Sequence, residues 1–549
     1  MTDFASVSRH TINNFLQSIV FIDDKAYAPA GYPDQHEFDA KEITKVFSKD
    51  GKVCAVYQLT QKSDIESLIT VAKKADVAVL DWQIVLDQDS DLFESNDEAD
   101  AEQDDIRGLY TKSIISGLLS DQECQNSIKL ILVYTGETDL EGIADDILEH
   151  IESDKISGFK IDKKNDTCTL NSNNCRIMVI AKSNRDGEYT DDYSLFKDKK
   201  ITYKELPNFI TQQFSDMTSG LLSNFAMESL SEIRRNFYHI INLFSKELDS
   251  AYLAHQTLLT NTEDANELLV DLLGDTFTSI IRYKKLNSFI NKENIKIWMN
   301  KNIPEVNKKI PEENGKPENI EYKRSHSLLL KLLESNNNVE EKYFNAFSSD
   351  INGQKIAKNK IKNLSGKLST TLFTESNNYE IINKKFANLC YHRNPISHPS
   401  YHPTLSLGTV VKSSLIPETY YICIQQRCDS VRLSNSESRR FLFISITKVK
   451  DDSKFNFLTP DGEKLLIDKG TYSLRTVKFR GIEGSVRTKC CNETGKKFFE
   501  PAHLSEEIPE KFEFIVELKE LYAQRILEEY SASLSRVGID EPEWVRRAR

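Results

Sequence analysis

Five short apolar runs in the first 210 residues constrain the fold of this chain more than any other feature. They are rich in Val and Ile and apolar throughout: SIVFI (18–22), VCAVY (53–57), VAVL (77–80), LILVY (130–134) and IMVI (177–180). Such runs are typical of strands buried on both faces of a parallel sheet. Amphipathic segments between the runs indicate helices. The sequence therefore predicts an α/β fold, with a doubly wound five-stranded parallel sheet in a domain over residues 1–210.

The later patterns predict two further domains. Over residues 211–403 apolar side chains recur at three- and four-residue spacing, which indicates a helical domain with a proline-containing linker near 301–325. Over residues 404–549, runs such as YYICIQ and FEFIVEL indicate a β-rich domain that closes with a helix. A chain of 549 residues is long enough for three such domains.

The negative charge of the chain comes largely from one segment. The net charge is −13, and residues 87–105 hold ten acidic and no basic side chains, so the rest sums to −3. A dense run of like charge indicates a solvated loop, and a loop that gates a nearby site is the alternative. Because a net acidic chain is not attracted to a duplex, we expect no DNA-binding role.

Targeting and cysteine patterns point to the cytoplasm. No run of about 18 apolar residues is present and the N-terminus lacks the layout of a signal peptide, so we expect no membrane association. Nine irregularly spaced cysteines favour reduced thiols. The alternative is a zinc site built from Cys423, Cys428, Cys490 and Cys491.

Polar residues follow four of the five runs in the first domain. Working sites of open α/β sheets lie at the carboxyl ends of the strands, so these residues are expected to meet at one edge. They are three carboxylates, a hydroxyl and an amine: Asp23, Asp24, Asp81, Thr135 and Lys182. Phosphoryl transfer to an aspartate needs this set, because carboxylates bind Mg²⁺ and a lysine can pair with the phosphate.

The same residues and their flanking strands resemble the receiver domain of two-component response regulators. The likeness lies in SIVFIDDKA, DVAVLDW, LVYTGE and IMVIAKSN, each placed as a strand of that family. The resemblance implies that Asp23, Asp24 and Asp81 hold Mg²⁺ and that Asp81 accepts phosphate from a histidine kinase. It also implies that Thr135 couples phosphorylation to a switch and that Lys182 pairs with the phosphoryl group.

The chain departs from the family pattern in three places. Ser183 follows the lysine where the family usually has proline. The acidic segment 87–105 enlarges the domain shortly after Asp81, and a hairpin-like stretch at 156–170 lies before the fifth strand. Ten carboxylates near a phosphate-accepting site raise the local negative potential, which could attract Mg²⁺ or slow an anionic donor.

The helical region offers a second, different hypothesis. Arg393 and His398 stand in an R-N-x-x-x-H pattern that resembles the HEPN family of RNases, whose site usually spans a homodimer interface. An arginine can clamp a phosphate and a histidine can exchange the 2′-OH proton. Lysines between 355 and 367 could bind RNA electrostatically. The other interpretation is a turn in which Arg393 and His398 cap a helix end.

The layout of the whole chain resembles proteins of phosphorelay-like bacterial anti-phage defence systems such as Detocs. This resemblance implies a phosphate sink or signalling intermediary, more a phosphoacceptor than an enzyme, whose partners include a histidine kinase and a second receiver protein. A third hypothesis is an inert receiver that serves as an interaction scaffold.

Overall fold

The structure is a computed structural model of the 549-residue chain, and it divides into two compact units, Met1–Pro304 and Glu305–Arg549. The described residues are 4–27, 39–86, 108–121, 124, 127–182, 198–259, 264–284, 290–309, 321–348, 365–366, 369–393, 401–416, 419–435, 437–450, 454–468, 470, 473–502 and 510–534. The acidic segment 87–105, Ser183 and His398 lie outside them. The domain boundaries expected after 210 and 403 stay predictions.

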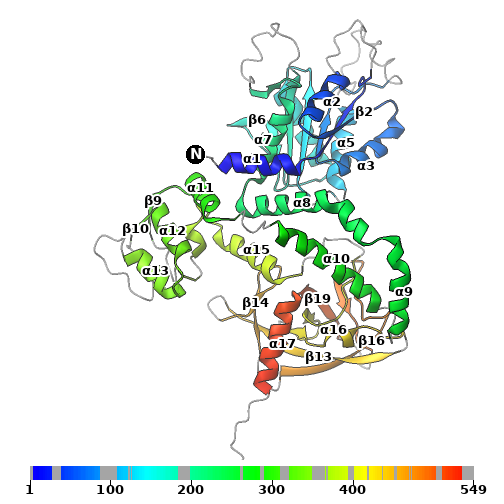
Figure 1. The fold of residues 1–549 in the computed structure, drawn as a ribbon, viewed down its shortest axis with the longest axis vertical. Coiled ribbons are helices and arrows are strands. Elements are labelled where there is room, and N and C mark those ends of the chain that lie inside the picture. Colours follow the sequence, from blue (N-terminus) through cyan, green and yellow to red (C-terminus); the bar gives the residue numbers. More distant parts are fainter. Residues whose placement is uncertain are drawn as a thin grey trace, which may run out of the picture. The chain divides into compact units, whose positions relative to one another are not determined.

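A sheet of parallel strands with helices on both faces forms the core of the first unit (Figure 1). Its five parallel strands follow the order β2-β1-β3-β4-β7. Their bounds are β1 Ser18–Asp23, β2 Val53–Gln58, β3 Val77–Leu80, β4 Lys129–Thr135 and β7 Cys175–Lys182. The predicted doubly wound fold is confirmed, and all five strands arise from the apolar runs seen in the sequence.

Three further strands extend the sheet along β7. The antiparallel hairpin β5 (Lys160–Asp162) and β6 (Asp166–Asn171) joins β7 through its first half, as at Leu170 opposite Ile177. The short strand β8 (Lys200–Ile201) pairs in parallel with the last two residues of β7. The sheet therefore has eight strands rather than the five expected, because the hairpin and β8 cover what would otherwise be an open edge.

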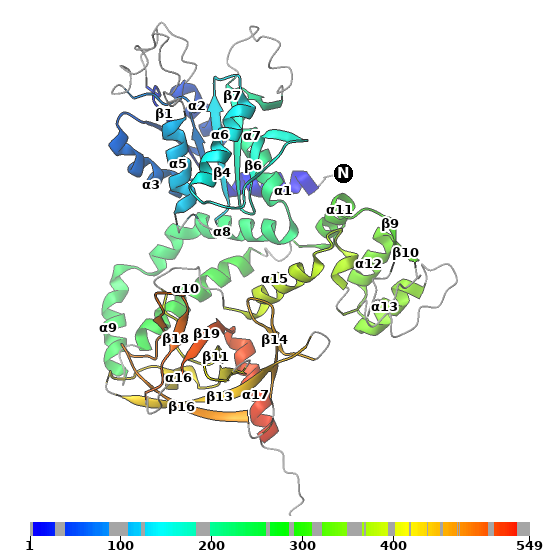
Figure 2. The ribbon, with the colours of Figure 1, turned by 180° about the vertical axis from the view of Figure 1, so that it is seen from behind.

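Helices cover both faces of this sheet (Figure 2). They are α1 Phe4–Phe15, α2 Ala40–Lys49, η1 Lys62–Asp64, α3 Ile65–Lys74, α5 Leu109–Ser120, α6 Leu140–Ser153 and α7 Leu206–Thr218. Successive residues of β1 show the division: Val20 belongs to the core cluster that also contains residues of α3, α5 and α6, whereas Phe21 belongs to the cluster that contains residues of α1, α2 and α7. Since successive side chains of a strand point to opposite faces, this double cover explains why the runs are apolar throughout.

The first unit continues into a helical region that begins against the sheet domain. It comprises α8 Leu221–Leu243, η4 Lys246–Leu248, α9 Asp249–Leu258, α10 Asp264–Tyr283 and α11 Lys292–Asn302. Helices α1 and α8 lie side by side (Figures 1 and 2), and the buried Asn224 donates to Ser8 Oγ at 2.8 Å. Arg234 of α8 donates to the Phe15 carbonyl at 2.9 Å and pairs with Asp76 at 3.2 Å.

The second unit begins with a small α/β portion. Its elements are β9 Val306–Lys309, β10 Glu321–Arg324, α12 His326–Glu334, α13 Val339–Ser348, η6 Ser369–Leu372 and α15 Tyr379–Tyr391. Strands β9 and β10 pair antiparallel, so the described ends of the stretch expected to be a linker form a hairpin. Pro304 precedes β9, where its missing N–H interrupts no strand pairing.

A nine-stranded antiparallel sheet forms the rest of the second unit, and it confirms the predicted β-rich region. Its strands are β11 Thr409–Ser413, β12 Thr419–Cys423, β13 Ser438–Lys448, β14 Phe457–Leu458, β15 Lys464–Ile467, β16 Leu474–Arg480, β17 Lys489–Cys490, β18 Lys497–Phe499 and β19 Phe512–Glu517. The short helix α16 Arg427–Ser430 follows β12, and α17 Glu520–Leu534 closes the unit by packing Ala523, Ile526 and Tyr530 on the sheet.

Among the described helices of both units, none combines the length and the apolar character needed to cross a membrane.

Candidate functional site

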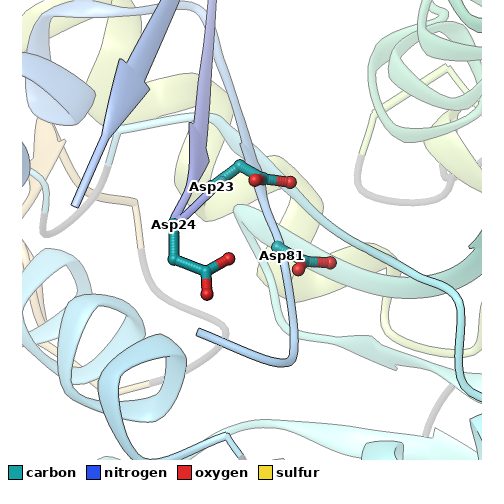
Figure 3. Close-up of side chains that lie close together, drawn as sticks. All are labelled: Asp23, Asp24 and Asp81. Carbon is teal, nitrogen blue, oxygen red and sulfur yellow. The ribbon is translucent and has the colours of Figure 1, made fainter. Parts of the chain in front are cut away.

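The topology of the first sheet places three acidic residues side by side. Strands β1 and β3 are adjacent and parallel, and their register aligns Ile22 with Leu80. Asp23 ends β1, Asp24 follows it, and Asp81 follows β3, so all three lie at the same carboxyl edge of the sheet. Figure 3 shows their carboxylates gathered there. Each residue offers one carboxylate oxygen, and these oxygens lie within 4.8 Å of one another.

The three carboxylates are buried and held by the backbone around them. Asp23, Asp24 and Asp81 are only 1%, 6% and 7% exposed. The N–H of Lys25 donates to Asp23 Oδ1 at 2.8 Å, and the N–H of Val85 donates to Asp24 Oδ2 at 3.0 Å. Because backbone groups make these bonds, the carboxylates of the acidic pair are oriented before any ligand arrives.

Lys182, the last residue of β7, supplies a cation to this cluster. Its Nζ lies 2.9 Å from Asp81 Oδ1 and 3.6 Å from Asp23 Oδ2. Burial by itself would lower the pKa of the Lys182 ammonium, but the charges of Asp81 and Asp23 outweigh burial and raise it. Lys182 is therefore charged at physiological pH, and its ammonium already touches the carboxylate expected to react.

The environment of Asp81 makes its carboxylate unusually basic. The pKa of Asp81 is raised to about 6 in total: burial is the largest cause, the charges of Asp23 and Asp24 also raise the pKa, and Lys182 lowers it in part. At pH 7 and above, the Asp81 carboxylate is mostly ionised. A carboxylate with this pKa is a better nucleophile than an exposed aspartate and still keeps its charge at neutral pH.

Thr135 stands at the same edge, at the end of β4. It is 1% exposed, and strand register aligns it with Ala181, the neighbour of Lys182. The N–H of Glu137 donates to Thr135 Oγ1 at 3.0 Å. Oγ1 is the acceptor in this bond, so the hydrogen of the Thr135 hydroxyl is not used in it.

The chemistry of the donor set fits magnesium. Three ionised carboxylates and one ammonium sum to a formal charge of −2, and a buried excess of this size is expensive without a cation. Mg²⁺ is a hard ion that one or more carboxylates bind while water and phosphate oxygens complete its shell. Asp23, Asp24 and Asp81 would hold it.

No other cluster of this kind occurs in the part of the chain that the structure describes. Among the described His, Cys, Asp and Glu side chains, Asp23, Asp24 and Asp81 are the one group of three or more that could hold a metal ion. The zinc alternative is therefore not supported by the described cysteines. Cys423 is a fully buried thiol in β12, where it packs as a small core side chain.

One contact at the site was not expected from the sequence. Thr111, in the first turn of α5, donates its hydroxyl to the carbonyl oxygen of Asp81 at 2.5 Å. The two residues are 30 positions apart, and the acidic segment lies between them. No local pattern marks a threonine in such a helix, so only a prediction of how α5 packs on β3 could have found it.

Of the two residues in the RNase hypothesis, Arg393 is among the residues that the structure describes and His398 is not. The Arg393 guanidinium donates to Glu517 Oε1 at 2.8 Å, and Arg427 contacts the same oxygen at 3.3 Å. The backbone N–H of Arg393 also donates to the Glu517 carbonyl at 2.8 Å. Arg393 thus joins α15 to the end of β19 through a buried carboxylate, while His398 lies outside the described residues.

Comparison with known protein families agrees with the geometry of the first unit. Residues 15–187 match the family described as a response receiver domain. This segment is a receiver domain. The match includes all five residues at the strand ends, from Asp23 to Lys182, and both enlargements, the acidic segment and the β5–β6 hairpin. Neither a curated protein nor a solved structure matches the chain.

The receiver domain supports a role in signalling by phosphate acceptance. Receiver domains bind Mg²⁺ at an acidic pocket, and the buried group of Asp23, Asp24 and Asp81 is such a pocket. The domain also implies a phosphodonor partner such as a histidine kinase.

Proposed function

We propose that this chain accepts a phosphoryl group on Asp81 and so acts as a response-regulator-like member of a phosphorelay. The observation that carries the proposal is the 2.9 Å contact between Lys182 Nζ and Asp81 Oδ1 inside a buried group of three carboxylates. A lysine in this position neutralises one charge of the nucleophile and remains next to the phosphoryl group after transfer.

The transfer proceeds by attack of an Asp81 carboxylate oxygen on the phosphorus of a phosphohistidine. A bond from oxygen to phosphorus forms, the bond from phosphorus to the imidazole nitrogen breaks, and the imidazole leaves with that electron pair. When bound, Mg²⁺ neutralises charge on the transferred group. Asp23, Asp24 and Asp81 would hold that cation, Lys182 would pair with a phosphoryl oxygen, and the Thr135 hydroxyl would donate to another.

We propose bacterial anti-phage defence as the biological context of this reaction. The layout of the chain, an enlarged receiver followed by a helical and a β-rich part, favours a cytoplasmic role in bacterial anti-phage defence. There it would act as a phosphate sink or signalling intermediary. Its partners would be a histidine kinase and a second receiver protein, and the chain itself could act as a homodimer. Neighbouring genes for a kinase and a second receiver would support this context.

The two alternative functions, RNA cleavage and an inert scaffold, require different properties of the chain. RNA cleavage needs Arg393 to be available to a phosphate, but its guanidinium is bonded to the buried Glu517 carboxylate. Comparing RNA degradation by the wild type and by His398→Ala tests this alternative directly. An inert scaffold needs no phosphorylation, so the experiment below separates it from the receiver role.

Phosphorylation of the full-length chain by acetyl phosphate and Mg²⁺ tests the assignment of Asp81. We expect acid-labile phosphate on the wild type and none on Asp81→Asn, because an amide cannot form the acyl phosphate. The measurement is intact-protein mass spectrometry before and after mild acid or hydroxylamine treatment. Beryllofluoride binding should follow the same pattern.

An exposed carboxylate provides the control. Asp216→Asn on α7 should be phosphorylated like the wild type. Phosphate that persists on Asp81→Asn would mean that another residue is the acceptor, and a wild type that takes no phosphate would leave the scaffold role.

A further inference from the structure

Thr111 makes an unusual hydrogen bond for a helical threonine of this chain. Buried threonines such as Thr211 and Thr218 donate to carbonyls one turn earlier in their own helix, at 2.9 and 2.7 Å. Thr111 lies in the first turn of α5, fully buried, and donates out of the helix to the Asp81 carbonyl at 2.5 Å. The Trp82 carbonyl lies 3.3 Å from the same hydroxyl.

Two more contacts join the start of α5 to the residue after Asp81. The ring of Trp82 packs on Gly108, the residue that precedes α5, so closely that an added Cβ would lie 2.2 Å from the ring. Gly108 also has φ +77°, which favours glycine. On the helix itself, Lys112 Nζ lies 5.8 Å from the ring centroid and is held at 2.9 Å from Asp146 of α6.

These contacts restrict the main chain at the reacting residue. The peptide bond between Asp81 and Trp82 is planar, so a hydrogen bond to its carbonyl fixes the orientation of the whole unit. The N–H of Asp81 donates to the Ile22 carbonyl at 2.9 Å, which fixes the preceding peptide as well. Because both peptides are held, the direction of the Cα–Cβ bond of Asp81 is fixed. The Asp81 carboxylate therefore stays within reach of Lys182.

We propose that Thr111 is a positioning residue for phosphoryl transfer, acting by holding the Asp81–Trp82 peptide so that the Asp81 carboxylate faces Lys182 and the acidic pair. The proposal rests on the proposed function of Asp81. Rates of transfer are sensitive to small displacements of a reacting group, because much of the catalysis is positioning.

The test compares two substitutions in the full-length chain. Thr111→Val keeps the branched shape and removes the hydroxyl, whereas Thr111→Ser keeps the hydroxyl and removes the methyl. We expect Thr111→Val to slow phosphorylation by acetyl phosphate and Mg²⁺ by about tenfold or more, equal to ~1.4 kcal/mol in the barrier. Thr111→Ser should restore most of the rate. Initial rates are measured well below the melting temperature, so a loss of stability alone does not change them.

Thr211→Val is the matched control, because Thr211 is a buried threonine that donates to a carbonyl of the same unit, away from the site. It should lose stability but keep the wild-type rate. The proposal is wrong if Thr111→Val reacts like the wild type, or if Thr111→Ser is as slow as Thr111→Val, since that pattern indicates packing.

Two further outcomes are distinguishable. A wild type that takes no phosphate overturns the proposed function and this role of Thr111 with it, whereas a reactive wild type with a fully active Thr111→Val overturns only the latter. If Thr111→Val does not fold, Thr111→Ala is measured in its place, and the same loss and the same rescue by serine are required of it.

Discussion

Asp81 binds a proton more tightly in the folded chain than an ordinary aspartate does, and this has a cost in stability. Burial and the charges of Asp23 and Asp24, opposed in part by Lys182, together raise its pKa to about 6. In the unfolded chain the same group ionises near pH 3.8. Between these two values the folded state holds more protons, so the contribution of Asp81 to stability falls as the pH rises through this window.

Asp81→Asn should therefore stabilise the metal-free protein at pH 8. The shift from 3.8 to about 6 corresponds to roughly 3 kcal/mol at most, since one pKa unit is about 1.4 kcal/mol. The gain should shrink toward pH 4, where Asp81 is protonated in the wild type. Urea unfolding in EDTA at pH 8, 6 and 4.5 measures it. A stabilisation that grows toward acid pH would contradict the pKa assigned to Asp81.

At the scale of elements, the hairpin β5–β6 determines how the edge of the sheet is closed. Its strand β6 pairs with β7 and buries Cys168 and Leu170 under α6, so it belongs to the same core as the site strands. Without the hairpin, β7 would expose unpaired N–H and C=O groups along its first half. The strand that carries Lys182 is thus supported by a pairing outside the five predicted strands.

Leu170→Ala should destabilise the first unit by about 2–5 kcal/mol, because Leu170 is fully buried and the substitution leaves a cavity. The same change at Leu222, which is 55% exposed, should cost well under 1 kcal/mol. Chemical denaturation followed by circular dichroism measures both. Equal effects of the two substitutions would mean that the hairpin is not part of the core.

At the scale of the whole molecule, the segment that matches the receiver family is shorter than the compact unit that contains it. The match covers residues 15–187, whereas the compact unit extends to Pro304. One face of the sheet is covered in part by side chains from outside the match, and Ile12 of α1, Phe214 of α7 and Met227 of α8 are buried there. The receiver domain of this chain therefore uses neighbouring helices as part of its own core.

A fragment of residues 15–187 should not fold by itself, whereas residues 1–304 should. Each buried large apolar side chain contributes about 1.5–3 kcal/mol, and removal of α1, α7 and α8 takes away Ile12, Leu206, Ile210, Phe214 and Met227. Their sum is comparable to the whole stability of a typical domain, about 5–15 kcal/mol. Thermal melts and size-exclusion chromatography of both fragments test this. A cooperative melt of the short fragment at the temperature of the long one would contradict it.

Much of the first unit could be predicted because its physical causes are local in the sequence. An apolar run must be buried on both faces, and the residue that ends it must lie at the carboxyl edge of the sheet. Asp23, Asp24, Asp81, Thr135 and Lys182 follow from this rule. The structure gathers the three aspartates into one group and places Lys182 against Asp81. The composition of that set by itself indicated a divalent cation and a phosphoryl group.

Only the tertiary structure decided which distant groups support the site. The bond from Thr111 to Asp81 and the packing of Trp82 on Gly108 join residues separated by the acidic segment, and no pattern in the sequence encodes that approach. The elevated pKa of Asp81 likewise arises from burial and from charges on β1 and β7. Apolar periodicity depends on near neighbours along the chain, so it can be recognised in the sequence. Hydrogen-bond partners and the electrostatic environment of a side chain depend on how helices and strands pack, so they are known only once the chain has folded.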